Sequence, residues 1–424
     1  MRGGPFQRSD LRCQAALSRP DGMAACSMPE QVRQRSVFQP WRLFMTLPFQ
    51  LRQTPLTAFN VSRGGRMVPF AGYEMPVQFA DGVLKEHLHC RVAAGLFDVS
   101  HMGQVILRPR TGRSEDAALA LERLVPVDVL GLKPGRQRYG LFTADDGGIL
   151  DDLMIANRGD HLFLVVNAAC KAQDVAHLRA HLGKDCEIEE LTDRALIALQ
   201  GPDAEAALAA LAPEVAEMHF MEVADINLLG TPCIVARAGY TGEDGYEISV
   251  PADRAAALAE ALLSDSRVRP VGLGARDSLR LESGLCLYGH DIDATTTPAQ
   301  GALEWAIQKV RRRGGARAGG FPGAEIILEE LATGASRRRV GLRIEGRAPI
   351  REGTELFAAE VGGEPVGQVT SGGFGPSVNA PVALAHVPTE LSSTDTPLFA
   401  EVRGKRLRVF VSPLPFIKQR YKRY

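Results

Sequence analysis

The sequence has little of what marks membrane-spanning, nucleotide-binding or serine-hydrolase proteins. No apolar run approaches the roughly twenty residues that a bilayer-crossing helix needs, so we expect no membrane span. There is no Walker loop and no Gly-x-Ser-x-Gly elbow. The stretch at 272–276 lacks the third glycine of a dinucleotide fingerprint and follows no clear strand, so we also expect no nucleotide cofactor.

Sequence patterns typical of disulfide bonds, metal sites and nucleic-acid binding are equally weak. The 7 cysteines are odd in number and never in C-x-x-C spacing, which is typical of reduced thiols. His87 and His89 lie beside Cys90, but two positions apart on a helix they face away from each other, so we expect no metal. A net charge of -1 does not favour general nucleic-acid binding, although arginines cluster at 311–313 and 337–339.

The first 50 residues differ in character from the rest. They contain scattered prolines and several arginines but no lysine. One interpretation is a mitochondrial transit peptide over residues 1–45, which would place the protein in the matrix. Asp10, Asp21 and Glu30 argue against it, because transit peptides are poor in acidic residues. We favour the alternative, a translation start at Met45 in a bacterial, cytoplasmic protein.

The remainder mixes short strands and helices without strict βαβ alternation, which predicts an α+β fold. We expect strands at 105–107, 161–167 and 195–200, and helices with Asp caps at 203–211 and 253–263. A basic, glycine-rich stretch at 309–323 predicts a domain boundary. Beyond it, regularly spaced short strands predict a β-barrel or sandwich. The domain limits that we expect are a leader at 1–50, an α+β domain at 51–310, a linker and helix at 311–335, and a β-domain at 336–424.

Asp98 is the first candidate functional residue, because it lies among apolar neighbours at 96–104. We expect a helix from an Asp81 cap to a stop at Gly95, followed by a strand, with Asp98 at the junction. Desolvation there raises a carboxyl pKa, which suits a general base or an anchor for a substrate N–H. The simpler interpretation is an Asp that caps its own turn.

Two further segments carry candidate binding groups. Residues 239–247 form a glycine-rich turn that enters a strand, and Glu247 could accept two parallel N–H bonds from an amidine-like edge such as that of a pterin. Residues 276–282 read as a helix on which Arg276 could bind a substrate carboxylate. In both cases an ordinary solvated or ion-paired charge is the competing interpretation.

Taken together, the segments at 67–78, 97–104, 239–247, 274–293 and 369–372 resemble those of the folate-dependent aminomethyltransferase family, the T-proteins of the glycine cleavage system. The resemblance runs from about Thr54 to the C-terminus. It implies a folate-binding α+β region of two intertwined subdomains followed by a C-terminal antiparallel β-barrel. It also implies transfer of a one-carbon unit from an aminomethyl-dihydrolipoyl carrier, the H-protein, to tetrahydrofolate, with release of ammonia and 5,10-methylenetetrahydrofolate.

The same resemblance implies roles for particular residues. Asp98 would be the catalytic aspartate and Glu247 would hold the pterin edge. The other substrate-contact or pocket residues would be Arg276, Tyr421, Tyr139, Asn167, Tyr240 and Trp305. Tyr421 is assigned by its spacing from Phe416, and Trp305 could equally be a core residue.

Two points remain open. Arg311, Arg312 and Arg313 could form part of a basic landing surface for an acidic carrier, or belong to a solvated linker. A non-enzymatic folate-binding protein that assists iron–sulfur assembly is the alternative function. Its Lys-Gly-Cys motif is absent here.

Overall fold

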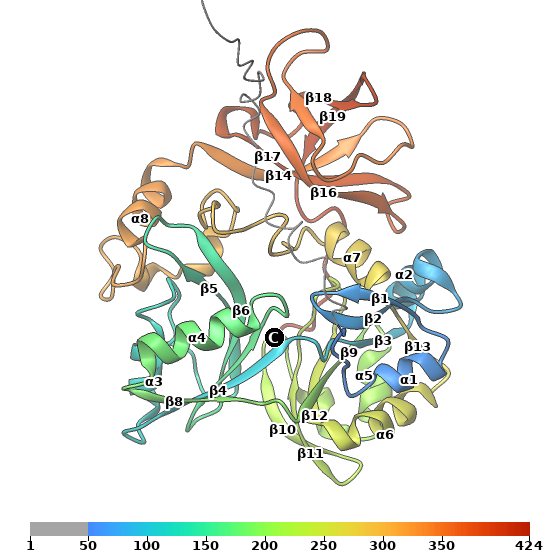
Figure 1. The fold of residues 1–424 in the computed structure, drawn as a ribbon, viewed down its shortest axis with the longest axis vertical. Helices are drawn as coiled ribbons and strands as arrows, with labels where there is room; N and C mark the ends of the chain where they lie inside the picture. Colours follow the sequence, from blue (N-terminus) through green and yellow to red (C-terminus); the bar gives the residue numbers. More distant parts are fainter. Residues whose placement is uncertain (1–49) are drawn as a thin grey trace, which may run out of the picture. The chain divides into compact units, whose positions relative to one another are not determined.

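The computed structural model describes residues 50–424 (Figure 1). The predictions for the leader, including a start at Met45, lie outside the described residues. Within the described part, the chain builds two larger sheets, a two-stranded ribbon and a closed barrel. None of the described helices is both long enough and apolar enough to cross a membrane.

The first larger sheet is antiparallel and has five strands. Helices α3 and α4 pack on it around one apolar core, to which Leu121 and Leu178 contribute. In spatial order the strands are β5 (Arg136–Thr143), β6 (Ile149–Asn157), β7 (Leu162–Val166), β4 (Gly103–Pro109) and β8 (Cys186–Glu190); the helices are α3 (Ser114–Leu121) and α4 (Lys171–Leu182).

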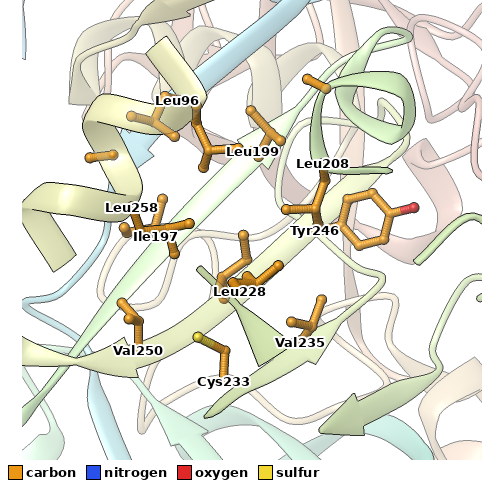
Figure 2. Close-up of a cluster of buried hydrophobic side chains, with 14 of the residues drawn as sticks. Leu96, Ile197, Leu199, Leu208, Leu228, Cys233, Val235, Tyr246, Val250 and Leu258 are labelled. Atoms are coloured by element: carbon orange, nitrogen blue, oxygen red, sulfur yellow. The ribbon is translucent and has the colours of Figure 1, made fainter. Parts of the chain in front are cut away.

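The second larger sheet has six strands. Helices α5 and α6 cover one face of this sheet. Figure 2 shows side chains buried between these helices and the sheet, including Ile197, Tyr246 and Leu258. Helix α7 packs on the other face. The strands in spatial order are β10 (Val223–Leu228), β11 (Thr231–Ala236), β12 (Gly245–Pro251), β9 (Arg194–Gln200), β3 (Ala94–Asp98) and β13 (Val268–Pro270); the helices are α5 (Ala204–Ala209), α6 (Ala252–Leu263) and α7 (Leu273–Glu282).

The two larger sheets are intertwined along the chain. The chain leaves the six-stranded sheet after β3, builds all of the five-stranded sheet from β4 to β8, and returns to pair β9 with β3. The ribbon and the helices beside it precede this excursion. They are α1 (Thr57–Ser62), β1 (Arg66–Phe70), β2 (Tyr73–Gln78) and α2 (Gly82–Val92). The predicted intertwined α+β region is thereby confirmed.

The C-terminal strands close into an antiparallel barrel, as predicted. Its interior is apolar and includes Leu342, Leu398 and Val409. The strands in order around the barrel are β14 (Arg337–Ile344), β17 (Ala380–Pro388), β16 (Gly367–Gly375), β15 (Glu355–Phe357), β18 (Pro397–Val402) and β19 (Lys405–Ser412). Helix α8 (Ala324–Thr333) and the short 3-10 helices η3 (Glu304–Ala306) and η4 (Lys309–Arg311) connect it to α7, while η2 (Pro213–Glu217) and η5 (Thr389–Leu391) lie elsewhere in the chain.

Several local predictions were wrong. The helix after Asp81 ends at Val92, and Gly95 lies inside β3, where an added Cβ would come 2.8 Å from Val271 Cγ2. Gly95 therefore permits close packing and does not stop the helix. Asp81 occupies the N-cap without a capping hydrogen bond and pairs with Arg269 instead.

Two more corrections concern helix starts. The N-cap of α6 is Pro251, with Asp253 in the first turn. A short strand, β13, does precede α7, but it pairs with β3 over only three residues. So short a strand between turns leaves no periodicity to detect.

The basic stretch at 309–323 is not a solvated linker. Arg311 is 4% exposed, and its Nη1 donates to Glu122 Oε2 at 3.1 Å. Arg312 donates to the backbone oxygen of Ile307, so only Arg313 of the three lies exposed. Arg311 is therefore not free to contribute to a basic landing surface, because it anchors this segment to the five-stranded half of the molecule.

Candidate functional site

A half-buried, oppositely charged pair lies on the α7 side of the six-stranded sheet. Strand register places Glu247 beside Ala198 and Ala236, which belong to the core that α7 covers, and Arg276 comes from α7. Burial raises the pKa of Glu247 and lowers that of Arg276, and the attraction between the two charges opposes both shifts. Both predicted binding residues are thus brought together.

Neither member of this pair is satisfied by the protein. Across residues 50–424, Arg276 Nη1 is buried without a hydrogen-bond partner. Its guanidinium lies over the ring of Tyr240, 5.0 Å from the centroid. Because buried polar groups are normally hydrogen-bonded, an unpartnered guanidinium beside a desolvated carboxylate is a strong indication of a ligand site.

The turn before β12 explains how these groups meet. Gly242 has a φ of +78°, and an added Cβ would come 2.2 Å from Ser283 Oγ just after α7. Only glycine allows so close an approach in this conformation. The turn therefore packs against α7, and Tyr240 reaches the backbone oxygen of Cys286 through its hydroxyl.

A third charged group, Asp152, enters from the five-stranded sheet and was missed by the sequence reasoning. It follows the buried Asp151 in β6, and its Oδ1 accepts a 2.7 Å hydrogen bond from Asn167 Nδ2. Burial and the neighbouring charge of Asp151 raise the pKa of Asp152 to about 7, against the hydrogen bonds from Tyr139 and Asn167. A carboxyl group with this pKa can give and take protons near neutral pH.

Tyrosines connect Asp152 to the Glu247 and Arg276 pair. Burial raises the pKa of Tyr139, and the charges of Asp152 and Tyr240 raise it further. Trp305 stacks on Tyr139 with ring centroids 5.3 Å apart and is 62% exposed, so the core interpretation of Trp305 is wrong. These contacts join six of the residues into one group, which we call the central cluster: Tyr139, Asp152, Asn167, Tyr240, Glu247 and Arg276.

Within residues 50–424, His101 adds a second buried side chain with an unpartnered atom. Its ring lies edge-on to Phe70 at 5.5 Å, and among the described residues its Nδ1 has no hydrogen-bond partner. Burial and the positive charges of Arg276 and Lys171 lower the pKa of His101 to about 3. The imidazole is therefore neutral at physiological pH.

Asp98 is not brought to the central cluster. It is 7% exposed, and its Oδ2 accepts hydrogen bonds from Thr54 Oγ1 at 2.7 Å and Asn60 Nδ2 at 2.8 Å, while Oδ1 accepts one from Ser100 N. Strand alternation points Asp98 to the sheet face opposite Glu247. Its contacts fix residues 54–60 to the end of β3.

Replacing Asp98 with asparagine is expected to lower the free energy of unfolding by about 1–3 kcal/mol, because an amide group mismatches three fixed donors. If Asp98 is the catalytic aspartate that the family resemblance implies, kcat per folded molecule should also fall by a factor of about a hundred or more. Urea unfolding and steady-state kinetics on the same preparation measure both. A kcat per folded molecule near that of the parent would contradict a catalytic role for Asp98.

Tyr421 is the remaining predicted residue, and it lies in the C-terminal tail. Its ring stacks on Phe220 with centroids 4.0 Å apart. The neighbouring Arg420 donates to Glu243 Oε1 at 2.7 Å. The contacts that hold Tyr421 are with Phe220 and the tail, and the structure does not join it to the central cluster.

No three His, Cys, Asp or Glu side chains within residues 50–424 are grouped as a metal site requires.

Comparison with protein-family models finds two matches. Residues 56–311 match the GCVT N-terminal domain, and residues 337–418 match the glycine cleavage T-protein C-terminal barrel domain.

Individual proteins give the same result. The chain is 44% identical over 380 residues to the mitochondrial aminomethyltransferase of Homo sapiens, covering 88% of this chain and 91% of that protein. It is 42% identical over 391 residues to the mitochondrial aminomethyltransferase of Dictyostelium discoideum, covering 88% and 94%. The crystal structure of the glycine cleavage system aminomethyltransferase T from Bartonella henselae matches with a TM-score of 0.82 and 44% identity, covering 88% of this chain and 100% of that chain.

Proposed function

Because this chain belongs to the glycine cleavage T-protein family, and is a tetrahydrofolate-dependent aminomethyltransferase, we propose that its central cluster binds the folate. The observation that carries the proposal is a desolvated Glu247 beside Arg276, whose buried Nη1 has no hydrogen-bond partner among the described residues. The reaction passes a one-carbon unit from an aminomethyl group on a lipoyl carrier to tetrahydrofolate. Ammonia and 5,10-methylenetetrahydrofolate are its products.

The chemistry requires one well-placed proton acceptor. An aminomethyl group on sulfur is a latent iminium ion. N5 of the folate attacks its carbon as the carbon–sulfur bond breaks, and the proton that N5 loses goes to the departing thiolate. N10 then loses its proton as it displaces ammonia and closes the ring. We propose that an aspartate takes this proton and returns it to the departing ammonia. Asp98 is the aspartate that the family resemblance implies, and its pKa is raised by burial. Asp152, whose pKa is about 7, is the second candidate.

Glu247 is proposed to hold the pterin edge. Its carboxylate has no hydrogen-bond donor within the described residues, so both oxygens are free for two parallel N–H groups of a ligand. Arg276 keeps this carboxylate charged in spite of burial. Tyr139, Tyr240 and Trp305 supply aromatic faces beside it.

Replacing Glu247 with glutamine is expected to weaken tetrahydrofolate binding by about 1–3 kcal/mol, because a charge-assisted bidentate contact becomes a mismatched neutral one. Isothermal titration calorimetry measures the change. Glu187→Gln, an exposed position on β8, is the matched control. An unchanged dissociation constant for Glu247→Gln would return Glu247 to a structural role.

The carrier is proposed to be the lipoylated H-protein, as the family implies. Ammonia release from aminomethylated H-protein, with and without tetrahydrofolate, tests the function directly. The non-enzymatic iron–sulfur role is not favoured, because relatives at 42% and 44% identity are named aminomethyltransferases. If the protein bound folate but released no ammonia, the non-enzymatic role would become the favoured one.

Location and domain limits remain proposals. The named relatives from Homo sapiens and Dictyostelium discoideum are mitochondrial, which supports the transit-peptide alternative over the bacterial, cytoplasmic preference. The intact mass of the native protein would show where the mature chain begins. The limits proposed are 51–310 for the folate-binding domain, 311–335 for the connecting segment and 336–424 for the barrel domain.

A further inference from the structure

After the barrel, the last residues of the chain return to the six-stranded sheet and contact the turn at 239–247. The backbone N–H of Arg420 donates to the backbone oxygen of Gly242 at 2.9 Å. Nη2 of Arg420 donates to Glu243 Oε1 at 2.7 Å and to the backbone oxygen of Arg91 at 2.8 Å. Arg420 therefore fastens the turn to the last part of α2.

Glu243 is a buried carboxylate that Arg420 reaches from the surface. The side chain of Glu243 is 0% exposed, whereas that of Arg420 is 49% exposed. Arg91 also donates to Glu243 Oε1, at 2.9 Å, but its guanidinium is shared with Glu282 Oε2 at 3.0 Å. Within residues 50–424, Glu243 Oε2 has no partner. Because a buried carboxylate with too few partners is costly, removing Arg420 weakens the conformation that buries Glu243.

The same turn carries an aromatic side chain of the central cluster. Tyr240 lies in a bend outside the strands, so its position depends on the contacts of the turn. Its ring lies 5.0 Å from the guanidinium of Arg276, and its hydroxyl donates to the backbone oxygen of Cys286. Glu247 differs from Tyr240, because pairing with β9 and β11 fixes Glu247 within β12.

Lys422 attaches the tail independently of Arg420. Its backbone N–H donates to Asp244 Oδ1 at 3.3 Å, and its Nζ donates to Glu205 Oε2 at 2.8 Å. Its backbone oxygen accepts from the N–H of Phe220 at 2.8 Å. A change of the Arg420 side chain therefore leaves the tail attached and acts on the turn.

We propose that Arg420 is a positioning residue of the folate site, which acts through Glu243 to hold the turn that places the ring of Tyr240 beside Arg276. The inference rests on the proposed binding of folate by the central cluster. It does not depend on which aspartate takes the proton of the reaction.

Replacing Arg420 with methionine removes the guanidinium donors and keeps an unbranched side chain. We expect the dissociation constant for tetrahydrofolate to rise about tenfold, because a loosened Tyr240 must be ordered when the ligand binds. At saturating folate and carrier, kcat should stay within about twofold of the parent, as when binding common to the ground and transition states is lost. Calorimetry and steady-state kinetics measure the two constants.

Two further variants serve as rescue and control. Arg420→Lys keeps a cationic donor toward Glu243, so its dissociation constant for tetrahydrofolate should lie within about threefold of the parent. Lys418→Met, an exposed position in the same tail, is the matched control and should bind folate as the parent does. A parent-like dissociation constant in Arg420→Met, or no rescue by Arg420→Lys, would overturn the proposal.

A double-mutant cycle shows whether Arg420 acts through Tyr240. In a Tyr240→Ala background the ring to be positioned is gone, so Arg420→Met should change the dissociation constant for tetrahydrofolate by less than about twofold. An effect of Arg420→Met that is equally large in both backgrounds contradicts the proposed route.

Hydrogen exchange in the absence of folate tests the turn separately from ligand binding. We expect peptides that cover 239–247 to exchange faster in Arg420→Met than in the parent, Arg420→Lys or Lys418→Met. Unchanged exchange in Arg420→Met would refute the hold on the turn. Faster exchange there, together with parent-like folate binding in Glu247→Gln and Tyr240→Ala, would instead refute the proposed folate site and leave the contact of Arg420 with the turn intact.

Discussion

Replacing Asp152 with asparagine should lower kcat by a factor of about a hundred or more, the usual size of a positioned acid–base group. The amide is nearly isosteric and can still contact Asn167 and Tyr139, so we expect the dissociation constant for tetrahydrofolate to change little. Formation of 5,10-methylenetetrahydrofolate at saturating carrier and folate measures kcat. Calorimetry on the same variant measures folate binding.

The pH dependence gives this prediction a second readout. Because Asp152 must be ionised to accept a proton and its pKa is about 7, kcat should rise as the pH increases through 7. The folded protein holds this proton more tightly than the unfolded chain does, so the ionised Asp152 costs stability above pH 7. Asp152→Asn should therefore lack this rise of kcat with pH and be at least as stable as the parent at pH 8. A kcat near that of the parent would remove Asp152 from the mechanism.

Motifs in the sequence identified candidate residues where each candidate lies within one continuous segment. The turn at 239–247 and the helix at 273–282 each contain one member of the charged pair, so Glu247 and Arg276 could be named as candidates from the sequence. The barrel was also predictable, because short strands alternate with turn residues at regular spacing.

Local sequence does not distinguish Asp98, the catalytic aspartate that the family resemblance implies, from Asp152, the second candidate. Both lie in apolar strands, and both have raised pKa values because of burial. What separates them is contact with distant residues. Thr54 is 44 positions from Asp98 and satisfies it, whereas the tyrosines of the central cluster leave Asp152 partly accessible. Two adjacent acids within the apolar run 149–155 were the available signal for Asp152.

The burial of Arg311 within the arginine run 311–313 also depends on a residue that is distant in the sequence. Three consecutive arginines usually remain solvated. Glu122 lies 189 positions from Arg311, and it is buried at 3% exposure, so its charge needs this cation. Nothing near either residue in the sequence indicates the pairing.

Glu282 is expected to be the most sensitive position for stability. Its carboxylate is fully buried at the end of α7, where Oε2 accepts from Arg91 Nη2 at 3.0 Å and Oε1 accepts from Ser377 N at 2.7 Å. His87 Nε2 lies 3.0 Å from Oε2. Glu282 therefore ties α2 and α7 to the β16–β17 turn of the barrel.

Replacing Glu282 with glutamine should lower the free energy of unfolding by about 3–5 kcal/mol at pH 7, because it leaves Arg91 buried with one partner fewer. Burial alone would raise the pKa of Glu282, but hydrogen bonds from His87 and Ser377 and the charge of Arg91 hold it at about 2. The stabilisation is therefore complete above the unfolded pKa of 4.5 and is lost as the pH falls toward 2. The difference between variant and parent should shrink over that range.

Urea unfolding at pH 7 and at pH 4 measures both parts of this prediction. Glu390→Gln, an exposed position in η5 beside the barrel, is the matched control and should change the free energy of unfolding by less than about 0.5 kcal/mol. A loss below about 1 kcal/mol for Glu282→Gln would be the size of an exposed ion pair. In that case Glu243, the other carboxylate on Arg91, would be the partner that holds the cation, and the barrel would not depend on Glu282 for its attachment.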